Sequence, residues 1–277
     1  VVLAWIAPRG IVAAAVSALF ALQLERLGYV QARTLAALTF LVIVVSVILQ
    51  SLTAKTVVRR LGVAAPPPRG GLIVGGNSVA RAVAQTLCER DIPVILADTT
   101  WENVRAARMA GIPVYHGNIL SEHADTYLDL TGIGTLLAMS RWPERNTLAS
   151  LYYRPLFGAD RVYTLRLDEE RDDKNRARMM PSYRIPRLFG EQITLTCLQE
   201  GLDQGYTLRA TPLTVNFDLA AFRDKWGDLA IPLFALDPKG ILRVFSTGES
   251  PQPSPGWTLI SLTPPAARLS TLSKCQA

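Results

Sequence analysis

The stretch LIVGGNSVARAVAQTL, residues 72–87, contains a short apolar run, a turn with two glycines and a helical pattern in direct succession. In the helical part, small and apolar residues recur on one face with a period of 3.6: Val79, Ala80, Val83, Ala84 and Leu87. A strand, a tight turn and a helix in this order are the context that a dinucleotide-binding fingerprint requires. We therefore interpret residue 72 as the start of an α/β unit that binds a nucleotide.

The turn itself, Gly75-Gly76-Asn77-Ser78-Val79-Ala80, fits the pattern G-x-G-x-x-G/A except that Asn77 replaces the second glycine. Gly75 allows the tight turn, and Ala80 allows the helix to lie close to the strand. Asn77 tolerates a left-handed backbone, but we expect its side chain to occupy space that a pyrophosphate would use. An α/β domain that has lost its ligand is therefore the alternative to a binding site.

Two further positions extend the predicted site. Asp98 ends the second apolar run, 23 residues after Gly75, where a carboxylate can accept hydrogen bonds from ribose hydroxyls. Gly117 and Asn118 follow the third run, at the edge where open α/β sheets bind ligands. Met139-Ser140 we interpret as an ordinary strand end. The predicted cofactor is NAD(H) or another adenine nucleotide, held by residues 75–80, Asp98, Gly117 and Asn118.

Apolar runs alternate with helical patterns from residue 72 to 167, which predicts a parallel sheet with right-handed crossovers. The expected strands are 72–74, 94–97, a run beginning at 114, 136–139 and 162–167, and the expected helices are 78–90, 101–110, 122–130 and 143–154. The charge-dense segment 168–188 reads as an exposed connector. Residues 189–264, with a helix near 189–203 and then apolar runs between turn signals, predict a small β-rich domain, and 265–277 form a tail without pattern.

The N-terminal part is typical of a membrane protein. Residues 34–54 carry no charge, and a helix of that length reaches about 31 Å, close to the thickness of a hydrocarbon core. Residues 1–22 form a second apolar segment, so we predict two spans within a membrane part, 1–62, followed by a Pro/Gly linker, 63–71. Lys55 and Arg60 after the second span predict that 55–277 are cytoplasmic. Because the chain begins with Val1 inside an apolar run, we expect further sequence before it.

Charge and composition exclude several other classes. The net charge is +6, but residues 1–60 carry +5 of it and residues 61–277 only +1, so the excess belongs to the membrane part and we expect no nucleic-acid partner. The three cysteines and two histidines show no metal-binding spacing, so we expect no metal. No arrangement of nucleophile and base stands out, so we expect no enzyme activity. Arg9, the one charge in the first apolar segment, we interpret as an interior arginine with a partner; an arginine that reaches the membrane surface is the alternative.

Ala7-Pro8-Arg9-Gly10-Ile11-Val12-Ala13 resembles the G-x-R-G-x-x-A stretch in the penultimate membrane helix of Na⁺/H⁺ exchanger-type monovalent cation/proton antiporters. Residues 72–166 resemble the TrkA-N (RCK) domain that regulates potassium channels, uptake systems and some antiporters, and the β-rich end resembles the TrkA-C module. The resemblance implies a role for Arg9 in organising the ion-binding helices, and nucleotide contacts at Gly75, Asn77, Asp98 and Gly117.

These features predict the C-terminal part of a monovalent cation (Na⁺ or K⁺)/proton antiporter in a bacterial inner membrane, with a cytosolic nucleotide-sensing domain and a homodimeric state. Its partners would be monovalent cations, protons and the lipid bilayer. The alternatives are a potassium channel or a regulatory subunit of potassium uptake and, third, a membrane-attached NAD-dependent oxidoreductase. The absence of a TVGYG-like filter between the apolar segments argues against a channel, and the absence of an acid/base set argues against an oxidoreductase.

Overall fold

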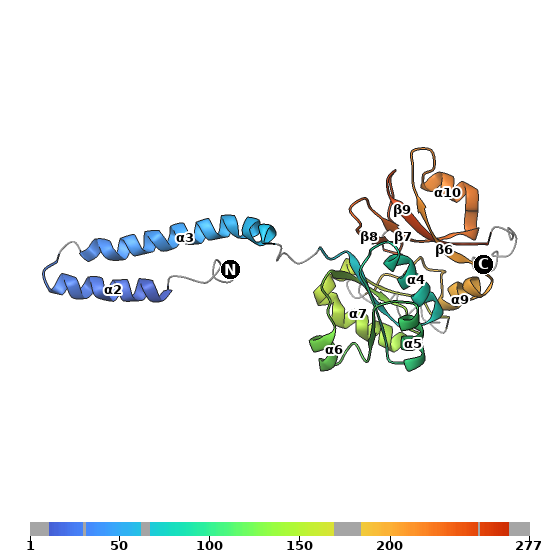
Figure 1. Cartoon of the computed structure of the whole chain (residues 1–277), viewed down its shortest axis with the longest axis horizontal. Coiled ribbons are helices and arrows are strands. Elements are labelled where there is room, and N and C mark those ends of the chain that lie inside the picture. The colour runs from blue at the N-terminus through green and yellow to red at the C-terminus, as the bar shows by residue number, and fades with distance from the viewer. Residues whose placement is uncertain (1–10, 30–31, 62–66, 169–183, 249, 266–277) are drawn as a thin grey trace. The chain divides into compact units, whose positions relative to one another are not determined.

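The computed structural model describes residues 11–29, 32–61, 67–168, 184–248 and 250–265, which divide into two compact units, Val1–Pro66 and Pro67–Ala277. In the first unit, α2 (Ile11–Arg26) and α3 (Arg33–Arg60) lie side by side (Figure 1). The second unit contains a parallel sheet and an antiparallel sheet.

The helices of the first unit differ in length from the predicted spans. Helix α3 has 28 residues instead of the expected 21, because the helix continues through the basic residues to Arg60, and Lys and Arg are good helix formers. Within the described residues, one segment, Ala37–Val58, is long and apolar enough to cross a membrane by its length and composition. Helix α2 has 16 residues and continues beyond the expected end at residue 22. Arg9 and the first ten residues of the first predicted span lie outside the described residues. The two-span arrangement therefore stays a prediction.

The parallel sheet confirms the predicted α/β fold of the second unit. Its strands lie in the order β3-β2-β1-β4-β5, and every neighbouring pair is parallel. The strands are β1 (Gly70–Val74), β2 (Val94–Asp98), β3 (Val114–His116), β4 (Ile133–Ala138) and β5 (Val162–Thr164). The helices between them are α4 (Ser78–Cys88), α5 (Trp101–Met109), α6 (Glu122–Tyr127) and α7 (Pro143–Phe157).

The strands are apolar throughout because both faces of the parallel sheet are covered (Figure 1). Successive side chains of a strand point to opposite faces. Ile73 therefore joins the core beneath α4 and α5, whereas Leu72 and Val74 join the core beneath α7. The helices between the strands thus bury the sheet on both sides and leave the loops at its carboxyl edge to build a site.

The antiparallel sheet has the strand order β6-β9-β7-β8, with β6 (Thr207–Pro212), β7 (Ile231–Leu236), β8 (Leu242–Val244) and β9 (Thr258–Thr263). Helix α9 (Leu195–Asp203) precedes it, and α10 (Leu219–Trp226) lies between β6 and β7. Phe234 and Ile260 share one hydrophobic core with residues of α4, so the two sheets are parts of one folded unit. The resemblance of this sheet to TrkA-C stays a prediction.

The end of the predicted connector is buried, contrary to the expectation of an exposed segment over 168–188. Leu188 lies in the shared core, and Arg187 is 6% exposed. The backbone N–H of Arg187 donates to Thr247 Oγ1, and Leu188 forms a bridge with Ser246. The burial could not be predicted from the charge-dense composition of the segment, because the partners lie about 60 residues later in the chain.

Candidate functional site

The predicted site lies where the strand order of the parallel sheet reverses. Strand β1 stands between β2 and β4, so the loops that follow β1 and β4 leave the sheet towards opposite faces. A crevice at the carboxyl ends of such strands is where open α/β sheets bind ligands. A small cleft opens at this edge, and it is lined by Gly75, Gly76, Asn77, Asp98, Thr100, Asn103, Ser140, Arg141, Trp142 and Arg145.

Gly75 is required by the close approach of two loops. Its φ is +103°, a conformation that side chains disfavour, and a Cβ at this position would lie 2.6 Å from the Cα of Ser140. At Gly76, a Cβ would lie 2.8 Å from Asn103 Cβ. The two glycines therefore bring the β1 turn against both the β4 loop and the start of α5.

Asp98 organises the cleft through hydrogen bonds to its carboxylate. Oδ2 accepts from the backbone N–H of Gly76 at 2.6 Å and from Asn103 Nδ2 at 2.8 Å, and Oδ1 accepts from the N–H of Thr100 at 2.8 Å. A carboxylate offers about four acceptor positions, and the side chain of Thr100 interacts with this one as well, so most of them are in use. Asp98 is 8% exposed and ties the turn after β1 to the beginning of α5.

The environment of Asp98 favours its charged form. Burial acts to raise the pKa of the carboxyl, but the hydrogen bonds from Thr100, Asn103 and Gly76 outweigh it, and the pKa lies below its ordinary value. A negative charge is therefore fixed beside the turn where a nucleotide would lie.

Asn77 does not use the left-handed backbone that this residue type tolerates. Its backbone is extended, with φ −65° and ψ 174°, and its side chain turns back into the fold. Oδ1 caps α4 by accepting from the N–H of Ala80 at 2.9 Å, and Nδ2 donates to the carbonyl of Met139 at 2.6 Å. Asn77 joins the β1 turn to the end of β4, because both halves of its amide find buried partners, and it also lines the cleft.

The other predicted site residues are divided between the cleft and the surrounding fold. Ser78 is exposed at the first turn of α4, whereas Val79 and Ala80 are buried in the core behind it. Gly117 and Asn118 follow β3 and are not among the residues that line the cleft. The N–H of Gly117 donates to the carbonyl of Asp98, and Asn118 Oδ1 accepts from Leu120 N–H, so both shape the β3 loop.

The residues that follow β4 line the cleft, although Ser140 was interpreted from the sequence as an ordinary strand end and Arg141 and Arg145 were not predicted to take part. Asn146, 1% exposed, holds this loop by accepting from the N–H of Ser140 and donating to its carbonyl. Arg141 and Arg145 flank the N-terminus of α7, where a helix favours negative charge. Two cations at the positive end of a helix are a signal for a bound anion. That signal was available from the pattern Ser140-Arg141-Trp142-Pro143, in which proline marks the helix start.

The cleft is closed in this structure. Arg145 Nη1 donates to Thr99 Oγ1 at 2.9 Å, across the space between α7 and the loop after β2, and Arg81 donates to the carbonyl of Gly76. The space left between the lining residues is about 20 Å³. One water molecule needs roughly 10–15 Å³ and drug-sized ligands about 300–1,000 Å³, so a nucleotide requires the cleft to widen.

Residues 72–179 match the TrkA-N domain family. The chain thus contains a TrkA-N (RCK) domain, and its Rossmann-like α/β fold agrees with the parallel sheet described above. No curated protein matches the chain.

Three solved structures are similar to the chain at 16% sequence identity, each covering 73% of it. They are the GsuK channel bound to NAD, with a TM-score of 0.35, and the GsuK channel and the GsuK RCK domain, each with a TM-score of 0.34. The chain spans 37% of the length of the two channel chains and 45% of the RCK-domain chain.

Replacing Asp98 by asparagine should destabilise the second unit by about 1–3 kcal/mol at neutral pH, because an amide cannot accept all three hydrogen bonds. A pKa lowered in the folded state stabilises the fold above the ordinary value, about 3.9, and this contribution disappears as the pH falls through the folded pKa. Urea unfolding of both proteins should therefore show a difference that shrinks below about pH 4. The exposed Asp224 of α10 provides the control, Asp224→Asn; a constant difference across this range would contradict the role of the charge.

Restoring the glycine of the fingerprint should not improve the fold. Asn77→Gly removes the cap of α4 and leaves the carbonyl of Met139 without its donor, so we expect a loss of about 1–2 kcal/mol in the free energy of unfolding. Asn77→Asp keeps the cap acceptor but places a carboxylate oxygen against the carbonyl oxygen of Met139, so it should also be less stable than the wild type. Thermal denaturation of the three proteins measures the order, and an increase in stability for the glycine variant would refute the bracing role.

Proposed function

We propose that the chain belongs to a membrane protein that moves monovalent cations and that its TrkA-N domain senses an adenine nucleotide. The observation that carries this proposal is the cleft at the switch point, where the N-termini of α4 and α7 converge with Arg141 and Arg145. Helix N-termini and arginines both favour a phosphate group. The match of residues 72–179 to the TrkA-N family supports the regulatory role.

Each part of a nucleotide has a fitting partner at this edge. The phosphate would meet the first turn of α4, beside the N–H of Ala80 that the side chain of Asn77 already caps. One ribose hydroxyl would donate to the carboxylate of Asp98 in place of the side chain of Thr100. Trp101, which is 54% exposed, stands outside the lining of the cleft and has Arg108 over one face of its indole, so an adenine would stack on the other face. These fits favour NAD(H), AMP or ADP over NADP(H), because a 2′-phosphate would be repelled by Asp98.

Sensing follows from the closed cleft. A phosphate that binds Arg145 would compete with Thr99 for its guanidinium, and the entering ligand would separate α7 from the loop after β2. A ligand that binds only the open arrangement shifts the population towards it. The domain would thereby convert nucleotide concentration into a change of its own shape, which is what a regulatory domain of a transport protein needs.

Calorimetry on residues 67–277 should detect binding of AMP, ADP or NAD(H), with weaker binding of NADP(H). Arg145→Gln should weaken binding about tenfold through the loss of a charge-assisted hydrogen bond, and Asp98→Ala should cost about 1–3 kcal/mol. Arg90→Gln, an exposed arginine after α4, is the matched control and should bind normally. The absence of heat with every adenine nucleotide at millimolar concentration would indicate a domain that has lost its ligand.

The kind of transport is a separate question with two candidates. The antiporter interpretation rests on the stretch 7–13, of which only Ile11–Ala13 lie within the described residues. The alternative to an antiporter is a potassium channel or a regulatory subunit of potassium uptake. Two of the similar structures are named as channels, which is in line with this alternative. The apolar helix segment Ala37–Val58 supports a membrane location in either case, with the second unit on the cytoplasmic side.

Liposomes containing the whole parent protein separate these candidates. An antiporter should move protons against a gradient of Na⁺ or K⁺ and collapse a pH difference in a cation-dependent way. A channel should pass K⁺ according to voltage without coupled protons. In either case the rate should change on addition of the nucleotide that binds the second unit, and a rate indifferent to that nucleotide would refute the regulatory role.

A further inference from the structure

A second polar pocket lies at the opposite edge of the parallel sheet from the nucleotide cleft. It has a volume of about 290 Å³, close to the lower limit for small-molecule sites. The lining residues stand before or at the amino ends of β1, β4 and β5 and along β8: Pro68, Arg69, Thr135, Asp160, Arg161, Tyr163, Ile241, Leu242, Arg243, Val244 and Pro251. Because open α/β sheets place their usual ligands at the carboxyl edge, this pocket is a distinct feature.

The charge of this amino-edge pocket is unbalanced. Arg69, Arg161 and Arg243 face one carboxylate, Asp160, which leaves a net charge of +2. Among the residues that the structure describes, none forms an ion pair with these three arginines. The three arginines are exposed, so water weakens their mutual repulsion, and Asp160 balances one of the three charges. A bound anion would balance the other two.

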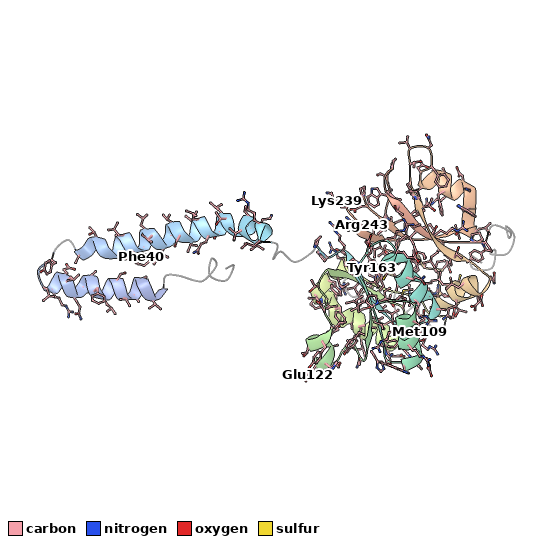
Figure 2. All side chains as sticks on the ribbon, in the orientation of Figure 1. Phe40, Met109, Glu122, Tyr163, Lys239 and Arg243 are labelled. Atoms are coloured by element: carbon pink, nitrogen blue, oxygen red, sulfur yellow. The ribbon has the colours of Figure 1, made fainter. Side chains whose placement is uncertain are left out.

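The three arginines come from three different parts of the fold. Arg69 precedes β1, Arg161 precedes β5, and Arg243 lies on β8 of the antiparallel sheet; Tyr163 and Arg243 are labelled in Figure 2. A Cβ added to Gly240 would lie 3.6 Å from a guanidinium nitrogen of Arg69, so the side chain of Arg69 reaches the turn before β8. The lining therefore includes residues of both sheets.

The floor of the pocket is rigid. Thr135 and Leu242 are buried, and the hydroxyl of Tyr163 donates to the carbonyl of Asp160 at 2.6 Å, which fixes the loop that carries Arg161. The backbone of Pro68 lies against Gly134, where a Cβ would come within 2.7 Å of the Pro68 carbonyl oxygen. The positions of Arg69 and Arg161 are thus set by packed backbone rather than by free loops.

From this lining we infer that the amino-edge pocket binds a phosphate-bearing anion that joins the two sheets of the second unit. Arginine matches phosphate because its planar fork donates two parallel hydrogen bonds. The group can come from a soluble phosphate compound or from the headgroup of an anionic lipid. The second source is favoured by sequence, because Arg69 follows the end of α3, at Arg60, by nine residues.

The test uses the full chain in detergent, with pyrophosphate as the soluble probe and calorimetry as the measurement. The wild type should bind, and the double variant Arg161→Gln/Arg243→Gln should bind at least about tenfold more weakly. Asp160→Asn removes the opposing charge and should bind more tightly than the wild type. Arg209→Gln, an exposed arginine of β6 outside the pocket, controls for net charge and should bind as the wild type does.

A second measurement identifies the source of the phosphate. It compares the binding of residues 67–277 to vesicles of phosphatidylcholine with and without phosphatidylglycerol. Binding of this second unit only to phosphatidylglycerol vesicles, lost in the double variant and reduced by pyrophosphate, assigns a lipid headgroup. Binding of pyrophosphate without vesicle binding assigns a soluble ligand. The proposal is overturned if neither probe binds the wild type, or if the double variant and Asp160→Asn bind pyrophosphate as tightly as the wild type. In the latter case the anion lies elsewhere, for example in the nucleotide cleft.

Discussion

The carboxylate of Asp98 is the constraint on which the carboxyl edge of this domain depends. A buried charge is costly unless hydrogen bonds replace its water, and here three donors do so. Those donors belong to the turn after β1, the residue before α5 and the first turn of α5. By satisfying one charge, the fold therefore fixes three segments of the site at once. Gly76 contributes through its backbone N–H, and its lack of a Cβ lets Asp98 and Asn103 come close.

Asp98 fixes the side of the cleft next to β2 and α5. Asn77 and Asn146 fix the side next to β4. Each asparagine uses both the donor and the acceptor of its amide on buried backbone, Asn77 between β1 and β4 and Asn146 within the β4 loop. The walls of the cleft are thus held by polar groups that are already satisfied within the protein. Arg145 is different, because its guanidinium is bonded to the hydroxyl of Thr99, a contact that a ligand can replace. The walls held by Asn77 and Asn146 can therefore stay in place while a ligand replaces the bond of Arg145 to Thr99.

Much of this arrangement could be predicted from the sequence, because it depends on local order. The strand, turn and helix of residues 72–87, the position of Asp98 at the end of β2 and the parallel sheet follow from periodicity and turn residues. The role of Asn77 could not be predicted, since the sequence does not say whether its amide points to a ligand or to Met139, 62 residues away. The burial of Arg187 and Leu188 likewise depends on partners in residues 245–247. Arg145 was missed because its importance arises only when α7 is brought next to Thr99.

Helix α7 relates the two candidate anion sites of the domain. Arg145 lies in its first turn at the nucleotide cleft, and Arg161 follows its last turn, after Gly158, at the amino-edge pocket. Strands β1 and β4 also run from one edge to the other, but they are buried and hydrogen-bonded on both sides, so they resist deformation. A displacement of α7 is the change that both sites would experience. By linkage, if a ligand at one end changes the affinity at the other end by moving this helix, the second ligand changes the affinity for the first by the same factor. A domain that carries phosphate-binding chemistry at both ends of one helix is therefore suited to combine two signals, one from each edge of its sheet.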